Sequence, residues 1–157
     1  MNVKKSVRLY NVLFPVWFFY FLPTPVLLVI LAFNIVVDYL VLYVAARYQK
    51  LEQIGRLEKQ CLVKVWLFGF LSDVLGAGLI FGLYYVLVEI TDWSLHFFPG
   101  ATLIAIPGVI AAGVLIYFFN RKFSFSKTAL SPEQIHKLSL ALAIFTAPYL
   151  MMIPLYG

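Results

Sequence analysis

The sequence has few of the residues from which soluble domains build their surfaces. Only 12% of its 157 residues are charged, whereas 63% are hydrophobic, and its mean hydropathy is +0.93. A soluble domain of this length needs far more polar surface to cover its core. The composition therefore excludes an ordinary soluble globular protein and predicts an integral membrane protein.

Cysteine and histidine are also scarce, since the chain has one cysteine, Cys61, and two histidines, His96 and His136. A single cysteine forms no internal disulfide bond. The His and Cys residues do not have the spacing of a metal site, and the sequence contains no HExxH motif, Ser-His-Asp order or phosphate-binding glycine loop. We therefore expect no metal and no cofactor, and the sequence leans away from an enzyme.

Long apolar runs take the place of these features and predict an all-α bundle of five transmembrane helices, formed by a single domain. A run such as 65–90 is about 40 Å long as a helix, which is enough to cross a hydrocarbon core of about 30 Å. Proline residues separate the first two runs, and the first helix is short and interrupted by Pro15. The predicted spans are 7–22, 25–46, 65–90, 101–119 and 138–156.

The segment 47–64 connects the second and third spans and has the pattern of an amphipathic helix. Its apolar residues Leu51, Ile54, Leu57 and Cys61 recur every three or four positions. The segment either lies in the cytoplasmic interface or extends the neighbouring spans, with Gly55 as an expected break.

The segment before the fifth span contains a helix start. Ser131 is followed by Pro132 and Gln134, which is the pattern of a capped helix N-terminus. We expect a basic loop over 120–131 before it, and a bend at Pro148 in the helix after it.

The twelve basic residues are confined to three segments, which precede the first span, join the second to the third, and join the fourth to the fifth. Five spans place all three segments on one side, which the positive-inside rule assigns to the cytoplasm. The N-terminus is then cytoplasmic and the C-terminus outside. We expect a multi-pass protein of the cell membrane, with the lipid bilayer and not nucleic acid as its partner.

Two carboxylates fall inside the apolar spans, and charged groups at such positions are functional candidates by default. Asp38 lies nine residues before Arg47, and Asp73 lies nine residues after Lys64. Because the two helices run in opposite directions, the two carboxylates are expected at similar depth.

Two neutral polar residues accompany the carboxylates. Asn34 shares a helix face with Asp38, and Ser72 adjoins Asp73. If the helices are neighbours, the four side chains form a candidate site for a proton or a hard cation, since adjacent carboxyl groups readily share one proton. The alternatives are that these residues hold the helices together, or that they contact a partner subunit or a substrate.

Small residues mark the faces on which helices approach one another closely. Gly69 and Gly76 share a face with Asp73, Gly78-x3-Gly82 lies on another face, and Gly108 lies in the fourth span. We expect them to pack inside the bundle, with a homodimer face as the alternative.

These features favour a small membrane protein that handles ions or a small solute through Asp38 and Asp73. A non-catalytic accessory or assembly subunit of a larger membrane complex is the alternative. A membrane-embedded enzyme acting on lipid is a weaker third, because no nucleophile or metal ligand accompanies the carboxylates.

Overall fold

The computed structural model describes residues 25–90 and 100–153, and this part of the chain is helical and contains no strand. The all-α prediction is confirmed for these residues. The elements, in order, are α1 (Pro25–Tyr48), α2 (Ile54–Tyr84), the π-helix η2 (Tyr85–Ile90), α3 (Gly100–Phe119), the π-helix η3 (Asn120–Ser124), α4 (Pro132–Phe145) and the 3₁₀-helix η4 (Tyr149–Met152).

Four helical stretches of the described residues are long and apolar enough to cross a membrane. They correspond to the second to fifth predicted spans, whereas the predicted span 7–22 lies outside the described residues. The four stretches are Leu27–Tyr48, Ile54–Leu87, Thr102–Ser124 and Pro132–Met152.

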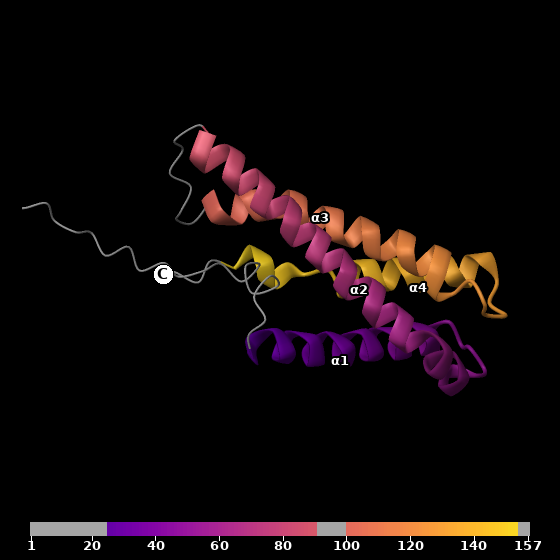
Figure 1. The fold of residues 1–157 in the computed structure, drawn as a ribbon. Coiled ribbons are helices and arrows are strands. Elements are labelled where there is room, and N and C mark those ends of the chain that lie inside the picture. Colours follow the sequence, from indigo (N-terminus) through magenta and orange to yellow (C-terminus); the bar gives the residue numbers. More distant parts are fainter. Residues whose placement is uncertain (1–24, 91–99, 154–157) are drawn as a thin grey trace, which may run out of the picture.

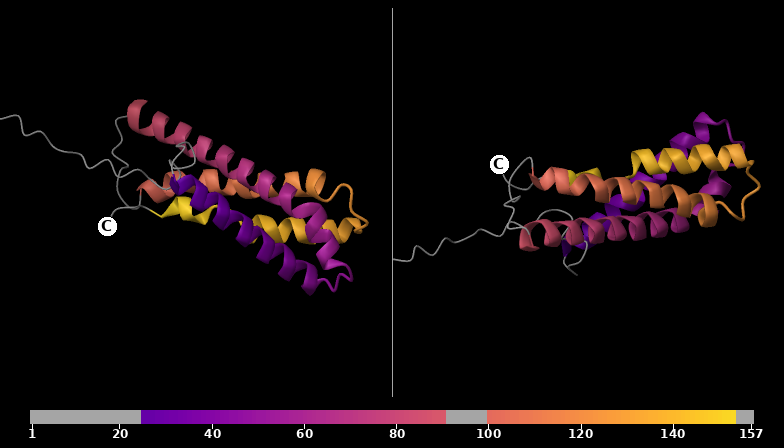
Figure 2. Two further views of the ribbon diagram at one scale, coloured as in Figure 1. Left: turned by 60° about the horizontal axis from the view of Figure 1, so that its bottom comes forward. Right: turned by 90° about the horizontal axis from the view of Figure 1, so that it is seen from above.

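The helices form a ring in which each long helix packs on two others. Helix α2 packs on α1 and α3, and α4 packs on the other sides of α1 and α3. The α1–α2 and α3–α4 connections lie at the same end of the bundle (Figures 1 and 2). This end therefore brings together the two basic segments that the structure describes.

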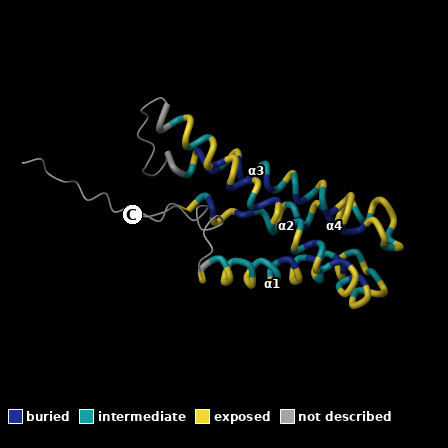
Figure 3. Tube along the Cα trace, in the orientation of Figure 1, coloured by how far each residue is buried: buried dark blue, intermediate teal, exposed yellow. Residues whose placement is uncertain are grey.

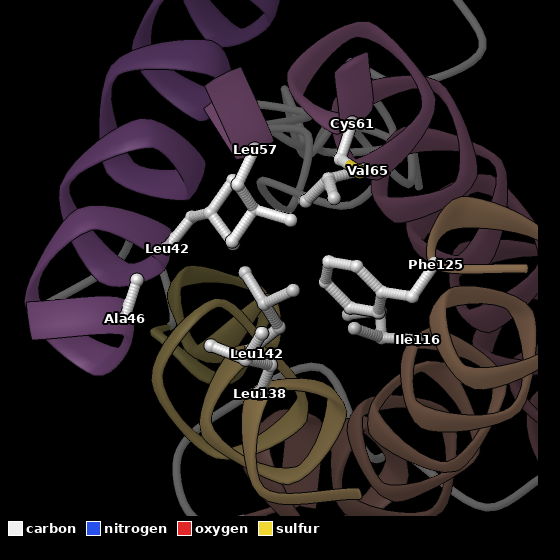
Figure 4. Packing of buried hydrophobic residues seen from close by; sticks show 9 residues of the cluster. All are labelled: Leu42, Ala46, Leu57, Cys61, Val65, Ile116, Phe125, Leu138 and Leu142. Atoms are coloured by element: carbon white, nitrogen blue, oxygen red, sulfur yellow. The ribbon is translucent and has the colours of Figure 1, made fainter. Parts of the chain in front are cut away.

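The core beneath this end contains residues from all four helices and the segment after η3 (Figure 4). Its nine fully or nearly fully buried members are Leu42, Ala46, Leu57, Cys61, Val65, Ile116, Phe125, Leu138 and Leu142. Large apolar residues also lie on the outside of the bundle, for example Leu28 and Val29, each 68% exposed. Exposed positions recur along the helices (Figure 3). An apolar exterior of this kind suits the hydrocarbon core of a membrane, where a protein surface contacts lipid tails and not water.

The segment 47–64 extends the two helices, which is one of the two arrangements predicted for it. Helix α1 continues to Tyr48 and α2 begins at Ile54. The amphipathic pattern arises because Leu57 and Cys61 pack in the core. Gly55 lies in the first turn of α2 and does not break the helix.

The prediction of a loop over 120–131 was wrong for its first five residues, because η3 extends α3 to Ser124. The Asn120 side chain donates a hydrogen bond to the Ile116 carbonyl at 2.9 Å, and the Phe125 N–H donates to the Asn120 carbonyl at 3.2 Å. This wider turn places Phe125 in the core, where it is fully buried.

The predicted start of the last helix is confirmed. The Gln134 N–H donates to Ser131 Oγ at 3.2 Å, and the Ser131 N–H donates to Gln134 Oε1 at 2.9 Å. This reciprocal capping box satisfies two backbone donors at the first turn of α4.

Replacing Ser131 by alanine is expected to lower stability by about 1 kcal/mol, because the Gln134 N–H loses its acceptor. Ser131→Asp retains an acceptor and should restore most of the loss. Denaturant unfolding of the detergent-solubilised variants would check this, and equal stability of alanine and aspartate variants would contradict it.

Helix α4 ends at Phe145, so the prediction of one helix over 138–156 was wrong, and Pro148 breaks the helix where a bend was expected. A proline ring clashes with the carbonyl four residues earlier and disfavours helical geometry in the preceding residue. Pro107, in contrast, lies inside an intact α3. The break leaves Thr146 half-buried at the C-terminus of α4.

Glycines of α2 behave in two different ways. A Cβ atom added to Gly76 would lie 2.7 Å from the Gly108 carbonyl oxygen, so these two glycines allow α2 and α3 to touch. A Cβ added to Gly78 or Gly82 meets nothing within 4 Å among the described residues. Among the described residues Gly78 and Gly82 therefore have no packing partner, and their expected packing inside the bundle stays a prediction.

Candidate functional site

Two hydrogen bonds link α1 to α2 beside the predicted site. Trp66 Nε1 donates to the Leu31 carbonyl at 3.1 Å, and Asn34 Nδ2 donates to Asp73 Oδ2 at 3.1 Å. The bond between Asn34 and Asp73, and the position of Gly69 beside Asp38, set the register of the two antiparallel helices. This register brings Asp38 and Asp73 to one place.

A small cavity lies between these helices and the end of α4. Its volume, measured as the space open to the centre of a water molecule, is about 10 Å³, which is about enough for one water molecule. The lining residues are Asn34, Val37, Asp38, Gly69, Asp73 and Thr146. Three helices therefore contribute to the site, and both predicted carboxylates belong to it.

The two carboxylates are withdrawn from the surface of the bundle. Asp38 is 4% exposed and Asp73 is 3% exposed. Asp73 accepts the hydrogen bond from Asn34 through one oxygen, while its other oxygen, Oδ1, is buried and has no hydrogen-bond partner among the described residues. A buried carboxylate oxygen without a partner is costly, and a proton, a water molecule or a cation would satisfy it.

Gly69 makes room for the Asp38 carboxylate. A Cβ atom added at this position would lie 3.3 Å from Asp38 Oδ2, which is closer than most Cβ contacts. Gly69 therefore packs against the carboxylate of Asp38 and not against an apolar side chain.

Thr146 was not predicted as a site residue, although Pro148 two positions later indicated an irregularity. Its hydroxyl donates to the Leu142 carbonyl at 2.8 Å, and its side chain also interacts with the Asp38 carboxyl group. Thr146 is also the C-terminal cap of α4. The C-terminus of a helix carries partial negative charge, which favours a cation or a proton nearby.

Ser72 is buried next to Asp73 but is not part of the cavity lining. Its hydroxyl donates to the Phe68 carbonyl of the same helix at 2.7 Å. The structure therefore brings together three of the four predicted site residues, Asn34, Asp38 and Asp73. The hydroxyl group at the cavity comes from Thr146 and not from Ser72.

The lining side chains include two carboxylates and a hydroxyl, whose oxygens are possible ligands, and the amide of Asn34, which meets Asp73 through its nitrogen. Such ligands suit a proton or a hard cation. Within residues 25–90 and 100–153, no group of three or more His, Cys, Asp or Glu side chains could hold a metal ion.

Comparison of the chain with protein family models, with curated proteins and with solved structures gives no match.

Proposed function

We propose that the protein is a multi-pass protein of the cell membrane that binds and handles protons or a small monovalent cation. The site is the pair Asp38 and Asp73, with Asn34 and Thr146 as neutral ligands. The observation that carries the proposal is the unpartnered oxygen of Asp73, buried at a cavity shared with a second carboxylate.

The size of the cavity supports a narrow range of occupants. About 10 Å³ accommodates one water molecule or one ion without its hydration shell. An organic solute needs a pocket of hundreds of cubic ångströms. The size of this cavity therefore does not support the hypothesis that the protein handles a small organic solute.

The charge distribution supports the topology that we propose with this function. Basic residues follow α1, begin α2 and surround the α3–α4 connection, which places them toward one end of the bundle. We assign this end to the cytoplasm, with five spans, a cytoplasmic N-terminus and an external C-terminus. Asp38 and Asp73 then lie about 13 Å from that surface, within the membrane.

Flux through the purified protein in liposomes tests the function. An imposed pH or Na⁺ gradient is expected to drive flux in the wild type, and Asp73→Asn is expected to reduce it to background. Asparagine keeps the size and the hydrogen bond to Asn34 but carries no charge and releases no proton. Asp38→Asn should have the same effect.

Ser72→Ala provides the matched control, because this side chain is equally buried and adjacent to Asp73 but does not line the cavity. It should retain flux within about twofold. Absence of flux in well-folded wild type under every imposed gradient would refute the proposal, as would equal flux in wild type and Asp73→Asn.

The second candidate function is an accessory subunit of a larger membrane complex. The exposed Gly78 and Gly82 favour it, because they allow a helix of another chain to approach α2 closely. Co-purification of a stoichiometric partner that is lost in Gly78→Leu, together with absent flux, would favour this function over ion handling.

A further inference from the structure

The end of the bundle that carries the two connections contains a cleft of about 560 Å³, far from the acidic site. The turn between α1 and α2 forms one side, and the segment between η3 and α4 forms the other. Because these connections lie side by side at one end (Figure 2), residues about 75 positions apart in the sequence face the same space. Lys50, Arg56 and Lys127 line it, together with Gln53, Thr128 and one acidic residue, Glu52.

The three cationic side chains of this cleft form no ion pair with any described residue. Among the described residues the ion pair present is Lys137–Glu133, so no carboxylate lies within 4.0 Å of Lys50, Arg56 or Lys127. Arg56 donates to the Gln53 side-chain oxygen at 3.4 Å, which is a long hydrogen bond. The guanidinium and both ammonium groups therefore keep most of their donors available.

Lys50 occupies its position at a conformational cost. Its φ angle is +53°, in the left-handed region that glycine adopts most easily, and it is the non-glycine residue with this property among those described. Its N–H donates to the Arg47 carbonyl at 3.0 Å, which closes the turn after α1. Glycine would close this turn with less strain, whereas lysine adds a positive charge to the cleft.

We infer that this cleft binds the phosphate of an anionic phospholipid headgroup. Clustered guanidinium and ammonium donors suit phosphate oxygens, and hydroxyl and amide groups around them can bind the rest of a headgroup. The cleft lies where the apolar stretches of α1, α2 and α4 begin or end, which is the depth of lipid phosphates if these helices cross the membrane. The volume is larger than one phosphate ion requires and fits a headgroup.

Binding of fluorescent phosphatidylglycerol to the full chain in neutral detergent tests the inference. The variant Lys50→Gln, Arg56→Gln, Lys127→Gln is expected to bind about tenfold more weakly than the wild type. The control variant Arg47→Gln, Lys64→Gln, Lys122→Gln removes the same charge, one arginine and two lysines, from outside the cleft. It should bind within about threefold of the wild type.

Equal weakening in both triple variants would overturn the inference, because it would show attraction by diffuse positive charge. Equal binding of fluorescent phosphatidylcholine would also overturn it. Inorganic phosphate, added as a competitor, should not displace the lipid at equal concentration. Displacement would assign the cleft to a soluble phosphate compound and reject the lipid.

Lys50→Gly separates binding from folding. It relieves the strain at φ +53° and is expected to raise the thermal midpoint by about 2–4 °C, while weakening phosphatidylglycerol binding. A variant that is more stable but binds less lipid excludes damage to the fold as the cause. Unchanged binding in this variant and in the triple variant would count against the cleft.

Discussion

Gly76→Val is expected to force α2 away from α3 and to lower the stability of the protein by about 3 kcal/mol. The first added carbon alone would lie 2.7 Å from the Gly108 carbonyl oxygen and 2.9 Å from the Ala112 Cβ. One of these atoms belongs to the backbone, so a rotamer change does not relieve the clash. The whole α3 helix has to move, and Ala77, Ile80 and Ala105 lose their packing with it.

Gly78→Val is the matched control, because it makes the same change two residues away on the same helix. No described residue lies within 4 Å of a Cβ atom there, and valine has a higher helix propensity than glycine. Its stability should equal that of the wild type or exceed it slightly. Unfolding in mixed micelles with increasing SDS would measure both variants, and similar losses in the two would show that the α2–α3 contact is not as close as described.

Gly69→Val is expected to abolish ion flux while the protein remains folded. The first added carbon would lie 3.3 Å from Asp38 Oδ2, and the branched methyl groups would extend into a cavity of only about 10 Å³. The obstacle here is a side-chain carboxylate that can turn, so stability should fall by about 1–2 kcal/mol, less than for Gly76→Val. The valine side chain, however, would leave no room in the cavity for an ion or a water molecule.

Gly82→Val controls for the added bulk, because it lies on the open face of α2 and should keep wild-type flux. Gly69→Ala, which adds only the first carbon, should give intermediate flux. The liposome assay with an imposed gradient measures all three variants. If Gly69→Val conducts as well as the wild type, the cavity between Asp38 and Asp73 is not the ion site, whatever the effect of the carboxylate substitutions.

Local signals in the sequence determined much of the fold. The apolar runs located α1 and α3 within two residues and overlapped most of α2 and part of α4, because the membrane requires a minimum length of apolar helix. The capping box at Ser131 marked the start of α4, since its two hydrogen bonds are made within one turn. The helical periodicity also placed Asn34 and Asp38 on one face, because that relation depends only on the geometry of a single helix.

Relations between helices were decided only by the tertiary structure. The same glycine spacing signal applies to a packed face and to an open one, so the sequence did not distinguish Gly76 from Gly78. Thr146 reaches the site because α4 breaks before Pro148, at the depth of Asp38. Ser72 does not line the cavity, because its hydroxyl donates a hydrogen bond to the Phe68 carbonyl of its own helix. The sequence determined which polar groups have to be buried in the spans. The packing of three helices determined which of these groups lie together, because contacts between helices depend on how the helices cross and on their register.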